Sequence, residues 1–248
     1  MMTESLKEIK EFIEEKYKYR TELHAHTAPV SSCADFFPED VVKTYADLGY
    51  TSVAIVNHYT YAYRFSRFEK EPGARKFTKW FLSDFKKAEK AGKKYGINVI
   101  LGAEIRFMEN NNDYLIFGID SETLEKVYGA LEYGIAEFKK NEAFKDVVVI
   151  QAHPHRKGME YTDSSFIDGM EIFNMHAGHN GRNALTVRRA KEDNLSVLTI
   201  GSDYHHEGGA GLCAIRTKEP VKDTFELAKI LKSGDYIFDV SEDTLILP

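Results

Sequence analysis

Residues 51–58 read TSVAIVNH, a run of small and β-branched apolar residues that ends in a histidine. A second run, DVVVIQAHP at residues 146–154, has the same character and also reaches a histidine. Continuous apolar runs of this kind are typical of strands buried on both faces, as in parallel sheets covered by helices. The two runs therefore predict a parallel β/α fold with polar residues at the strand ends.

Short β-like segments alternate with helical ones along the rest of the chain. Strands are expected at residues 21–26, 52–58, 99–107, 114–120, 147–153, 170–175 and 197–203. Helices are expected at residues 1–18, 38–49, 74–95, 122–140, 180–192 and 224–232. This alternation favours one α/β domain, residues 1–248, closed as a barrel. An open doubly wound sheet is the alternative, but no G-x-G-x-x-G turn follows the first strand to indicate dinucleotide binding.

Composition narrows the classes of partner. The net charge is −6 with mixed signs, and the two cysteines, Cys33 and Cys213, form no C-x-x-C pair. The charge disfavours a nucleic-acid groove, although the segment YTYAYRFSRF at residues 59–68 could stack on a base or pack on the barrel rim. The cysteine usage indicates a reduced, cytoplasmic compartment. No run approaches the roughly 18 apolar residues of a membrane span.

All nine histidines lie at or just after predicted strand ends: His24, His26, His58, His153, His155, His176, His179, His205 and His206. In a parallel barrel these ends share one face, which holds the active site. Alternate residues of a strand point the same way, so His24 and His26 could bind one ion together. Any single histidine could instead be a hydrogen-bonded structural residue. The whole set, with Glu104 and Asp203, predicts a metal site.

These residues also carry a resemblance. The segments LHAHT, AIVNHYT, LGAEIRF, QAHP and TIGSDYHH resemble, in order, motifs of the PHP (polymerase and histidinol phosphatase) superfamily, and they extend from residue 21 to about 210. The resemblance implies a distorted (β/α)7 TIM-like barrel. It also implies two or three divalent cations, of zinc, manganese or iron, and the hydrolysis of phosphoesters.

The resemblance further implies which residues bind the cations. His24 and His26 would bind the first with Glu104 and Asp203, Glu104 would bridge to a second held by His153, and His58 and His205 would hold a third.

The chain departs from the family pattern in places. Asn57 stands where an aspartate is common, and APVSSCADF lacks the usual acid, which leaves Cys33, Asp35 or water as the third-cation ligand. The fourth strand offers Asp113 and Asp120 where a histidine is common. We expect Asp120 to be the ligand because it ends a strand taken as parallel. An aspartate there favours Mn²⁺ over Zn²⁺.

Arginines and the remaining histidines are candidates for holding substrate. Arg106 lies two residues after Glu104 and is expected to bind phosphate and act in catalysis, or else to form a surface salt bridge. Arg182 opens a predicted helix, and His155 and His179 follow strand ends. His176 or His179 could protonate the leaving group or bind phosphate, or either could hydrogen-bond to a metal ligand; we assign His176 to catalysis and His179 to substrate binding.

We therefore predict a metal-dependent phosphoesterase. It would hydrolyse a small phosphate monoester through a hydroxide that bridges the cations of a di- or trinuclear site. A metal-dependent amidohydrolase is one alternative, although that class usually carries a bridging carboxylated lysine where this chain has Glu104. A non-catalytic metal-binding module is the other. The residues do not choose among phosphoester substrates.

Overall fold

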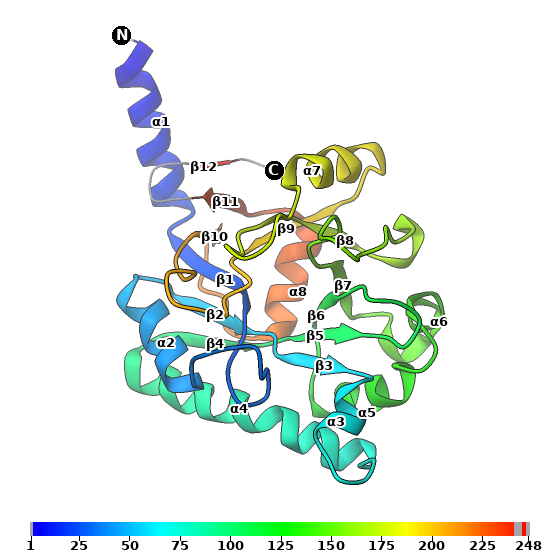
Figure 1. Cartoon of the computed structure of the whole chain (residues 1–248). Helices are drawn as coiled ribbons and strands as arrows, with labels where there is room; N and C mark the ends of the chain where they lie inside the picture. Colours follow the sequence, from blue (N-terminus) through cyan, green and yellow to red (C-terminus); the bar gives the residue numbers. More distant parts are fainter. Residues whose placement is uncertain (1, 241–244, 247–248) are drawn as a thin grey trace.

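A computed structural model of the chain describes residues 2–240 and 245–246. Its strands form two six-stranded sheets (Figure 1). The first sheet has the order β12 (Leu245–Ile246), β11 (Ile237–Val240), β10 (Cys213–Thr217), β1 (Tyr19–Ala25), β2 (Ser52–Ile55), β4 (Asn98–Leu101). The second has the order β3 (His58–Thr60), β5 (Ala103–Arg106), β6 (Tyr114–Phe117), β7 (Val148–Gln151), β8 (Gly169–Asn174), β9 (Val197–Gly201).

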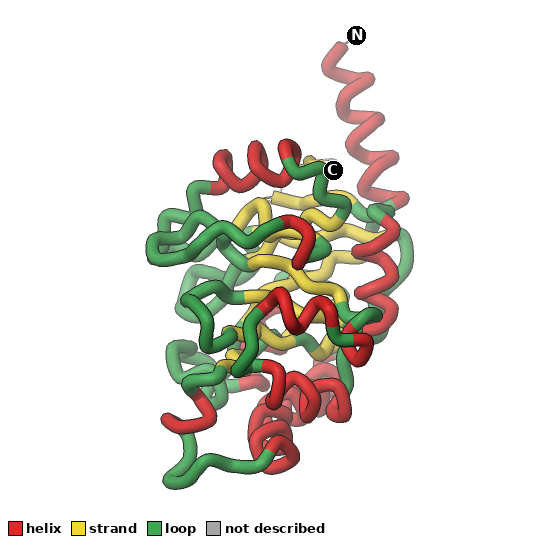
Figure 2. The backbone as a smooth tube through the Cα atoms, turned by 90° about the vertical axis from the view of Figure 1, so that its right-hand side faces the viewer, coloured by secondary structure: helices red, strands yellow, loops and turns green. Residues whose placement is uncertain are grey.

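Helices lie around the strands, which pass through the middle of the molecule (Figure 2). They are α1 (Met2–Lys16), α2 (Pro38–Asp47), α3 (Tyr63–Ser66), α4 (Ala74–Tyr95), α5 (Ser121–Ala130), α6 (Ile135–Lys140), α7 (Asn183–Glu192) and α8 (Thr224–Ser233), with 3-10 turns η1 (Glu142–Phe144) and η2 (Ser164–Phe166). The helix predicted at 74–95 is confirmed, and that at 122–140 is divided into α5 and α6. Helix α1 extends away from the sheets (Figure 1). No helix in the described residues is long and apolar enough to cross a bilayer.

The predicted strands at 52–58 and 99–107 each cross from the first sheet to the second. β2 pairs in parallel with β4, and their continuations β3 and β5 pair in parallel in the other sheet. Gly102 lies at one crossing, where a Cβ would come 2.7 Å from the side chains of both Val56 and Phe117. The crossing places His58 directly opposite Glu104 in the β3–β5 ladder.

The expected barrel of parallel strands is not confirmed. Between β1 and β9, the described residues form only an isolated bridge, Ala25 with Tyr204, so strand pairing does not close the two sheets into a barrel. β6 runs antiparallel to both β5 and β7. The connection at residues 107–113 explains the first reversal, because a parallel crossover needs about a dozen residues or more. The domain is a mixed α/β structure.

The apolar runs form central strands because their side chains are buried in the hydrophobic core. Every residue of β2 and of β7 is buried, as TSVAIVNH and DVVVIQAHP predicted. The main core is built around large buried side chains such as Tyr59, Phe77 and Phe117. A second cluster, which includes Val41 and Tyr45, lies beneath α2 and α4. This packing fixes the strand ends that carry the histidines.

Candidate metal centre

The side chains of His24, His26, Glu104 and Asp203 meet where β1 and β9 end, next to β5. All four residues are at least 98 % buried, with exposures of 0 %, 1 %, 1 % and 2 %. The Nε2 atoms of His24 and His26 lie 3.1 Å apart, so both rings face one centre as the H-x-H spacing predicted.

The distances between these donor atoms suit a bound cation. His24 Nε2 lies 3.5 Å from Glu104 Oε1 and 3.3 Å from Asp203 Oδ1. His26 Nε2 lies 3.5 Å from Glu104 Oε2 and 3.5 Å from Asp203 Oδ1. A tetrahedral zinc ion with bonds of about 2.0–2.1 Å has neighbouring ligands about 3.3 Å apart. The nitrogen and oxygen donors therefore stand at the spacing of ligands around one divalent cation.

Glu171 fixes the orientation of His24. Its fully buried carboxylate in β8 accepts a hydrogen bond from His24 Nδ1 at 2.7 Å and another from the His153 backbone N–H at 3.0 Å. The hydrogen bond holds Nδ1 toward Glu171 and turns Nε2 of His24 toward the cluster.

A second network orients His26. The Ser31 hydroxyl donates to Asn57 Oδ1 at 3.0 Å, so its oxygen accepts from His26 Nδ1 at 3.2 Å and from the His58 backbone N–H at 3.0 Å. Asn57 also accepts from the Thr27 backbone N–H at 2.7 Å. Asn57, where an aspartate was common in the pattern above, thus organises the loop that supports His26 and does not itself face the cluster.

A second group of donors surrounds Glu104. His153 Nε2 lies 3.1 Å from Glu104 Oε1 and 3.9 Å from Asp113 Oδ2. Nitrogen and oxygen atoms of His24, Glu104 and His153 all lie within 4.8 Å of one another. Glu104 therefore contacts both donor groups, and its Oε1 lies near His24 of the first and His153 of the second.

Asp120 does not reach this cluster, and the prediction that it is a ligand was wrong. Because β6 runs antiparallel to its neighbours, the residue before the strand, Asp113, lies at the cluster, and Asp120 lies beyond the opposite end. Asp120 is exposed and caps α5, where its side chain accepts from the Thr123 backbone N–H at 2.8 Å. Asp113 is 99 % buried.

The third group lies on the outer side of His26. Nitrogens of His26, His58 and His205 lie within 4.8 Å of one another. His205 Nδ1 donates to the Asp203 carbonyl at 2.8 Å, which leaves its Nε2 lone pair available. Cys33 Sγ lies 3.2 Å from His58 Nε2.

The electrostatics of the cluster keep its carboxylates charged. Burial raises the pKa of Glu104, but His58 and His153 outweigh it and hold the value well below the usual range. Burial likewise raises the pKa of Asp203, and His24 and His205 lower it well below the usual range. Burial lowers the pKa of His24, but Glu171 and Asp203 together raise it far above its ordinary value.

Several buried atoms at the centre have no hydrogen-bond partner. They include Glu104 Oε2, His58 Nδ1 and His153 Nδ1. Glu104 Oε2 and His58 Nδ1 lie 2.7 Å apart but without the alignment of a hydrogen bond. Buried polar atoms are nearly always paired, so unpaired atoms facing a donor cluster suit a bound cation. The spacing and the unpaired atoms both indicate that these residues fit divalent metal ions.

Backbone strain is concentrated at the same place. Among the described non-glycine residues with positive φ are His153 at 31°, Asp203 at 50° and Arg182 at 48°. Such conformations cost about 1–3 kcal/mol each and are typical of functional sites. The fold therefore holds two of the candidate ligands, His153 and Asp203, in backbone conformations that non-glycine residues rarely adopt.

Comparison with known proteins agrees with this geometry. Residues 22–240 match the PHP domain. The chain belongs to the PHP domain family. A two-domain protein from Bacteroides vulgatus that contains a predicted PHP-like metal-dependent phosphoesterase has a similar structure, with a TM-score of 0.60 and 15 % identity over 90 % of this chain and 64 % of that one. PsfC from Pseudomonas syringae PB-5123 has a TM-score of 0.58 and 12 % identity over 90 % of this chain and 92 % of its own. At these identities the likeness establishes the fold, and no curated protein sequence matches the chain.

In this PHP domain, the predicted phosphate clamp Arg106 is already engaged. It donates to Asp113 Oδ1 from Nε at 2.7 Å and to Oδ2 from Nη2 at 2.6 Å. His155 also has a partner in the fold, because its Nδ1 lies 3.0 Å from Thr186 Oγ1 of α7. These two candidates therefore contact protein groups and do not project freely toward the cluster.

The other predicted substrate-binding residues line a basic pocket beside the cluster. The pocket has a volume of about 580 Å³, and His179 and Arg182 line it together with Arg156 and Lys157. His176 connects it to the cluster, because its ring centroid lies 4.3 Å from that of His179 and 5.4 Å from that of His205. Burial, with His179 and His205, lowers the pKa of His176 to about 4 against the opposing charge of Asp203.

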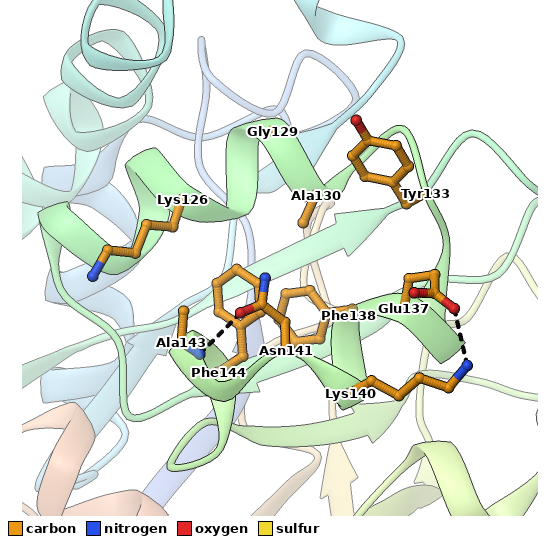
Figure 3. A pocket seen from close by; sticks show the side chains of 10 residues that line it. All are labelled: Lys126, Gly129, Ala130, Tyr133, Glu137, Phe138, Lys140, Asn141, Ala143 and Phe144. Carbon is orange, nitrogen blue, oxygen red and sulfur yellow. Dashed lines mark hydrogen bonds and ion pairs between the residues drawn. The ribbon is translucent and has the colours of Figure 1, made fainter.

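A different pocket contains none of the candidate residues. It lies between α5 and α6, with Tyr133 and Phe138 among its lining side chains (Figure 3). Its charged groups pair locally, for example Glu137 with Lys140 at 2.9 Å. It offers no cluster of metal-binding side chains, so the strand-end cluster remains the candidate site.

Two groups that complete the centre, Glu171 and Asn174, were not predicted from the sequence. Glu171 interrupts the apolar strand GMEIF, and that single charge on a buried strand was the available signal. Asn174 donates to both Glu171 at 2.9 Å and Asp203 at 3.2 Å. Its position three residues after Glu171 carries no signal without knowledge of where β9 lies.

Proposed function

We propose that this PHP domain is a metal-dependent phosphoesterase that hydrolyses a small phosphate monoester with two or three divalent cations of zinc, manganese or iron. The observation that carries the proposal is the spacing of 3.1–3.5 Å between the Nε2 atoms of His24 and His26 and from these atoms to the nearest carboxylate oxygens of Glu104 and Asp203. When bound, such cations lower the pKa of a water molecule and neutralise charge on the phosphoryl oxygens.

The chain offers ligands for each cation in turn. His24, His26, Glu104 and Asp203 would hold the first. Glu104 would bridge to the second, which His153 and Asp113 would complete, and His58 and His205 would hold the third. Asp113 replaces Asp120 in this set for the reason given above.

Substrate would be held from the loop that follows β8. Arg182, Arg156 and Lys157 supply positive charge around the basic pocket, and His179 supplies a further nitrogen there. Arginine suits phosphate because its planar fork donates two parallel hydrogen bonds. Arg106 would act by holding Asp113 in place.

His176 would contact the reacting group as a neutral donor. The Gly178 backbone N–H donates to His176 Nδ1 at 2.9 Å, which makes Nδ1 an acceptor and leaves the proton on Nε2. Nε2–H can then donate a hydrogen bond to a phosphoryl or leaving-group oxygen. This role refines the leaving-group acid expected for His176.

Turnover of p-nitrophenyl phosphate tests the proposal. The full chain, treated with chelator and then supplied with Mn²⁺ or Zn²⁺, should hydrolyse it, and the chelated protein should not. Glu104→Gln should lose most of the turnover and bind fewer cations. Glu122→Gln is the control, because Glu122 is an exposed residue paired with Lys126 on α5.

Two experimental outcomes would overturn this proposal in favour of another function. Hydrolysis of amides or lactones, with no phosphoester turned over, would make the chain an amidohydrolase. Bound cations without turnover of any phosphorylated metabolite in a broad screen would make it a metal-binding module.

A further inference from the structure

Cys33 occupies the outer edge of the cluster, in the loop between β1 and α2. Its side chain is exposed, and its Sγ lies 3.2 Å from His58 Nε2. It also interacts with His205, the other histidine of the outer donor group. Cys33 is therefore next to both histidines that sequence analysis left without an acidic partner.

The sulfur stands at a distance that suits a shared cation. Zinc bonds of about 2.3 Å to sulfur and 2.0–2.1 Å to nitrogen, at a tetrahedral angle, place the two ligand atoms about 3.5 Å apart. The distance between Cys33 Sγ and His58 Nε2 is close to that value. His205 presents Nε2 to the same side, because its Nδ1 is used by the Asp203 carbonyl.

The acid nearest in sequence is engaged elsewhere. Asp35 is 60 % exposed in its side chain and pairs with His206 Nδ1 at 2.8 Å. It thus contacts the histidine that lies outside the donor group. Of the two side chains considered for the missing ligand, only Cys33 lies at His58.

The other ring nitrogen of His58, Nδ1, faces the inner donor group, so the ring lies between Cys33 and Glu104. Glu104 Oε2 is buried, has no hydrogen-bond partner and lies 2.7 Å from His58 Nδ1. Glu104 is 99 % buried, so water does not satisfy this oxygen from the surface. A positive charge at His58 would stabilise it.

We propose that Cys33 is a thiolate ligand which, with His58 and His205, holds a cation in an N₂S site and makes that site select zinc over manganese. The inference rests on the proposed metal centre and names a ligand within it. Thiolate and imidazole suit Zn²⁺, whereas Mn²⁺ and Mg²⁺ prefer oxygen ligands. Three protein ligands leave a fourth position open for a substrate oxygen, as in catalytic zinc sites.

Cobalt spectroscopy tests the ligand directly. The full chain is stripped with chelator and titrated with Co²⁺ alone, and thiolate bound to cobalt gives a charge-transfer band in the near ultraviolet. We expect the band in the wild type and in Cys213→Ala, and its loss in Cys33→Ser and Cys33→Asp. Cys213 is the matched control, because it is the other cysteine of the chain and is 99 % buried in β10.

Metal content gives a second readout. Cys33→Ser should bind about one zinc fewer per chain than the wild type. Cys33→Asp, with an oxygen ligand, should regain binding when Mn²⁺ replaces Zn²⁺. Zinc should also protect Cys33 of the wild type from iodoacetamide.

The outcomes separate this inference from the proposed function. A cobalt band that persists in Cys33→Ser, or that the wild type lacks, overturns Cys33 as a ligand even if the chain hydrolyses phosphoesters. A band that depends on Cys33 in a chain without phosphoesterase turnover supports the ligand and overturns the function. Circular dichroism of each variant tests whether loss of the band arises from unfolding, and we expect a folded spectrum for each.

Discussion

Arg106 holds Asp113 with two hydrogen bonds, from Nε to Oδ1 at 2.7 Å and from Nη2 to Oδ2 at 2.6 Å. The carboxylate is buried beside His153, whereas the guanidinium is about one-third exposed, at 34 %. Arg106 therefore fixes the orientation of a candidate ligand, and this explains its position two residues after Glu104 without a direct contact to phosphate.

Arg106→Lys should weaken metal binding more than substrate binding. Lysine keeps the charge but lacks the planar fork that holds both carboxylate oxygens. Loss of a group that orients a ligand typically lowers metal affinity about 10- to 100-fold. We expect this fall in Mn²⁺ affinity, measured by competition with a chromogenic chelator, and little change in KM once metal is saturating.

Arg216→Lys is the control for this variant. Arg216 donates to Asp239 at 2.8 Å in an ion pair between β10 and β11, away from the donor cluster. It should leave metal affinity unchanged. A raised KM in Arg106→Lys with full metal content would restore the clamp role first expected for Arg106.

Asp113→Asn and Asp120→Asn should differ in metal content. Asp113 lies at His153, and an amide is a weaker ligand than a carboxylate, so this variant should lose the second cation. Asp120 lies at the cap of α5, where asparagine caps as well as aspartate. Equal metal content in both variants, measured by elemental analysis after reconstitution, would remove Asp113 from the site.

Asp120→Ala should instead lower stability, in a pH-dependent way. The helix cap contributes about 1 kcal/mol. Hydrogen bonds from Thr123 lower the pKa of Asp120 in the folded state, so the charge-dependent part of its contribution is present above the unfolded pKa of about 3.9 and is lost as pH falls through the folded value. Urea denaturation at pH 7 and pH 3 should show the variant closer to wild type at pH 3. An equal difference at both pH values would show that the carboxylate charge does not contribute.

The contrast between these two aspartates shows what sequence could determine. Strand periodicity placed His24 and His26 on one side, and the apolar runs placed β2 and β7 in the core, because both are local properties. The direction of β6 is set by the short connection after β5, so the choice of Asp120 over Asp113 failed. Glu171 was missed because its partner His24 is 147 residues away in the chain.

Arg182→Ala should raise KM for the phosphoester. Arg182 is exposed at the basic pocket and no hydrogen bond to a protein carboxylate is seen for it in the described residues. A hydrogen bond to a charged group contributes about 1.5–3 kcal/mol, so its loss should raise KM about 10- to 100-fold. Steady-state kinetics at saturating metal measure this change.

Arg188→Ala is the matched control on α7, the helix that Arg182 immediately precedes. Arg188 is 75 % exposed in its side chain and pairs with Glu192 at 3.0 Å. Surface pairs of this kind contribute little, so kinetics and stability should stay close to wild type. If both variants raise KM alike, the effect comes from general charge and not from the pocket.

Gly201→Ala should disrupt the contact between His24 and Glu171, because both residues pack against Gly201. A Cβ at Gly201 would lie 2.4 Å from Glu171 Oε1 and 2.4 Å from the Cβ of His24, too close for either to stay in place. Overpacking of this kind costs about 1–3 kcal/mol, and the shift should separate His24 from Glu171. Urea denaturation and metal titration should both show a loss. Gly129→Ala in α5 is the control, because an added Cβ would meet no atom within 4 Å apart from its chain neighbours and the nearby backbone of its own helix, and the change should stabilise the fold by about 0.4–1 kcal/mol. Wild-type metal affinity in Gly201→Ala would mean that the Glu171–His24 hydrogen bond is not needed to orient the first ligand.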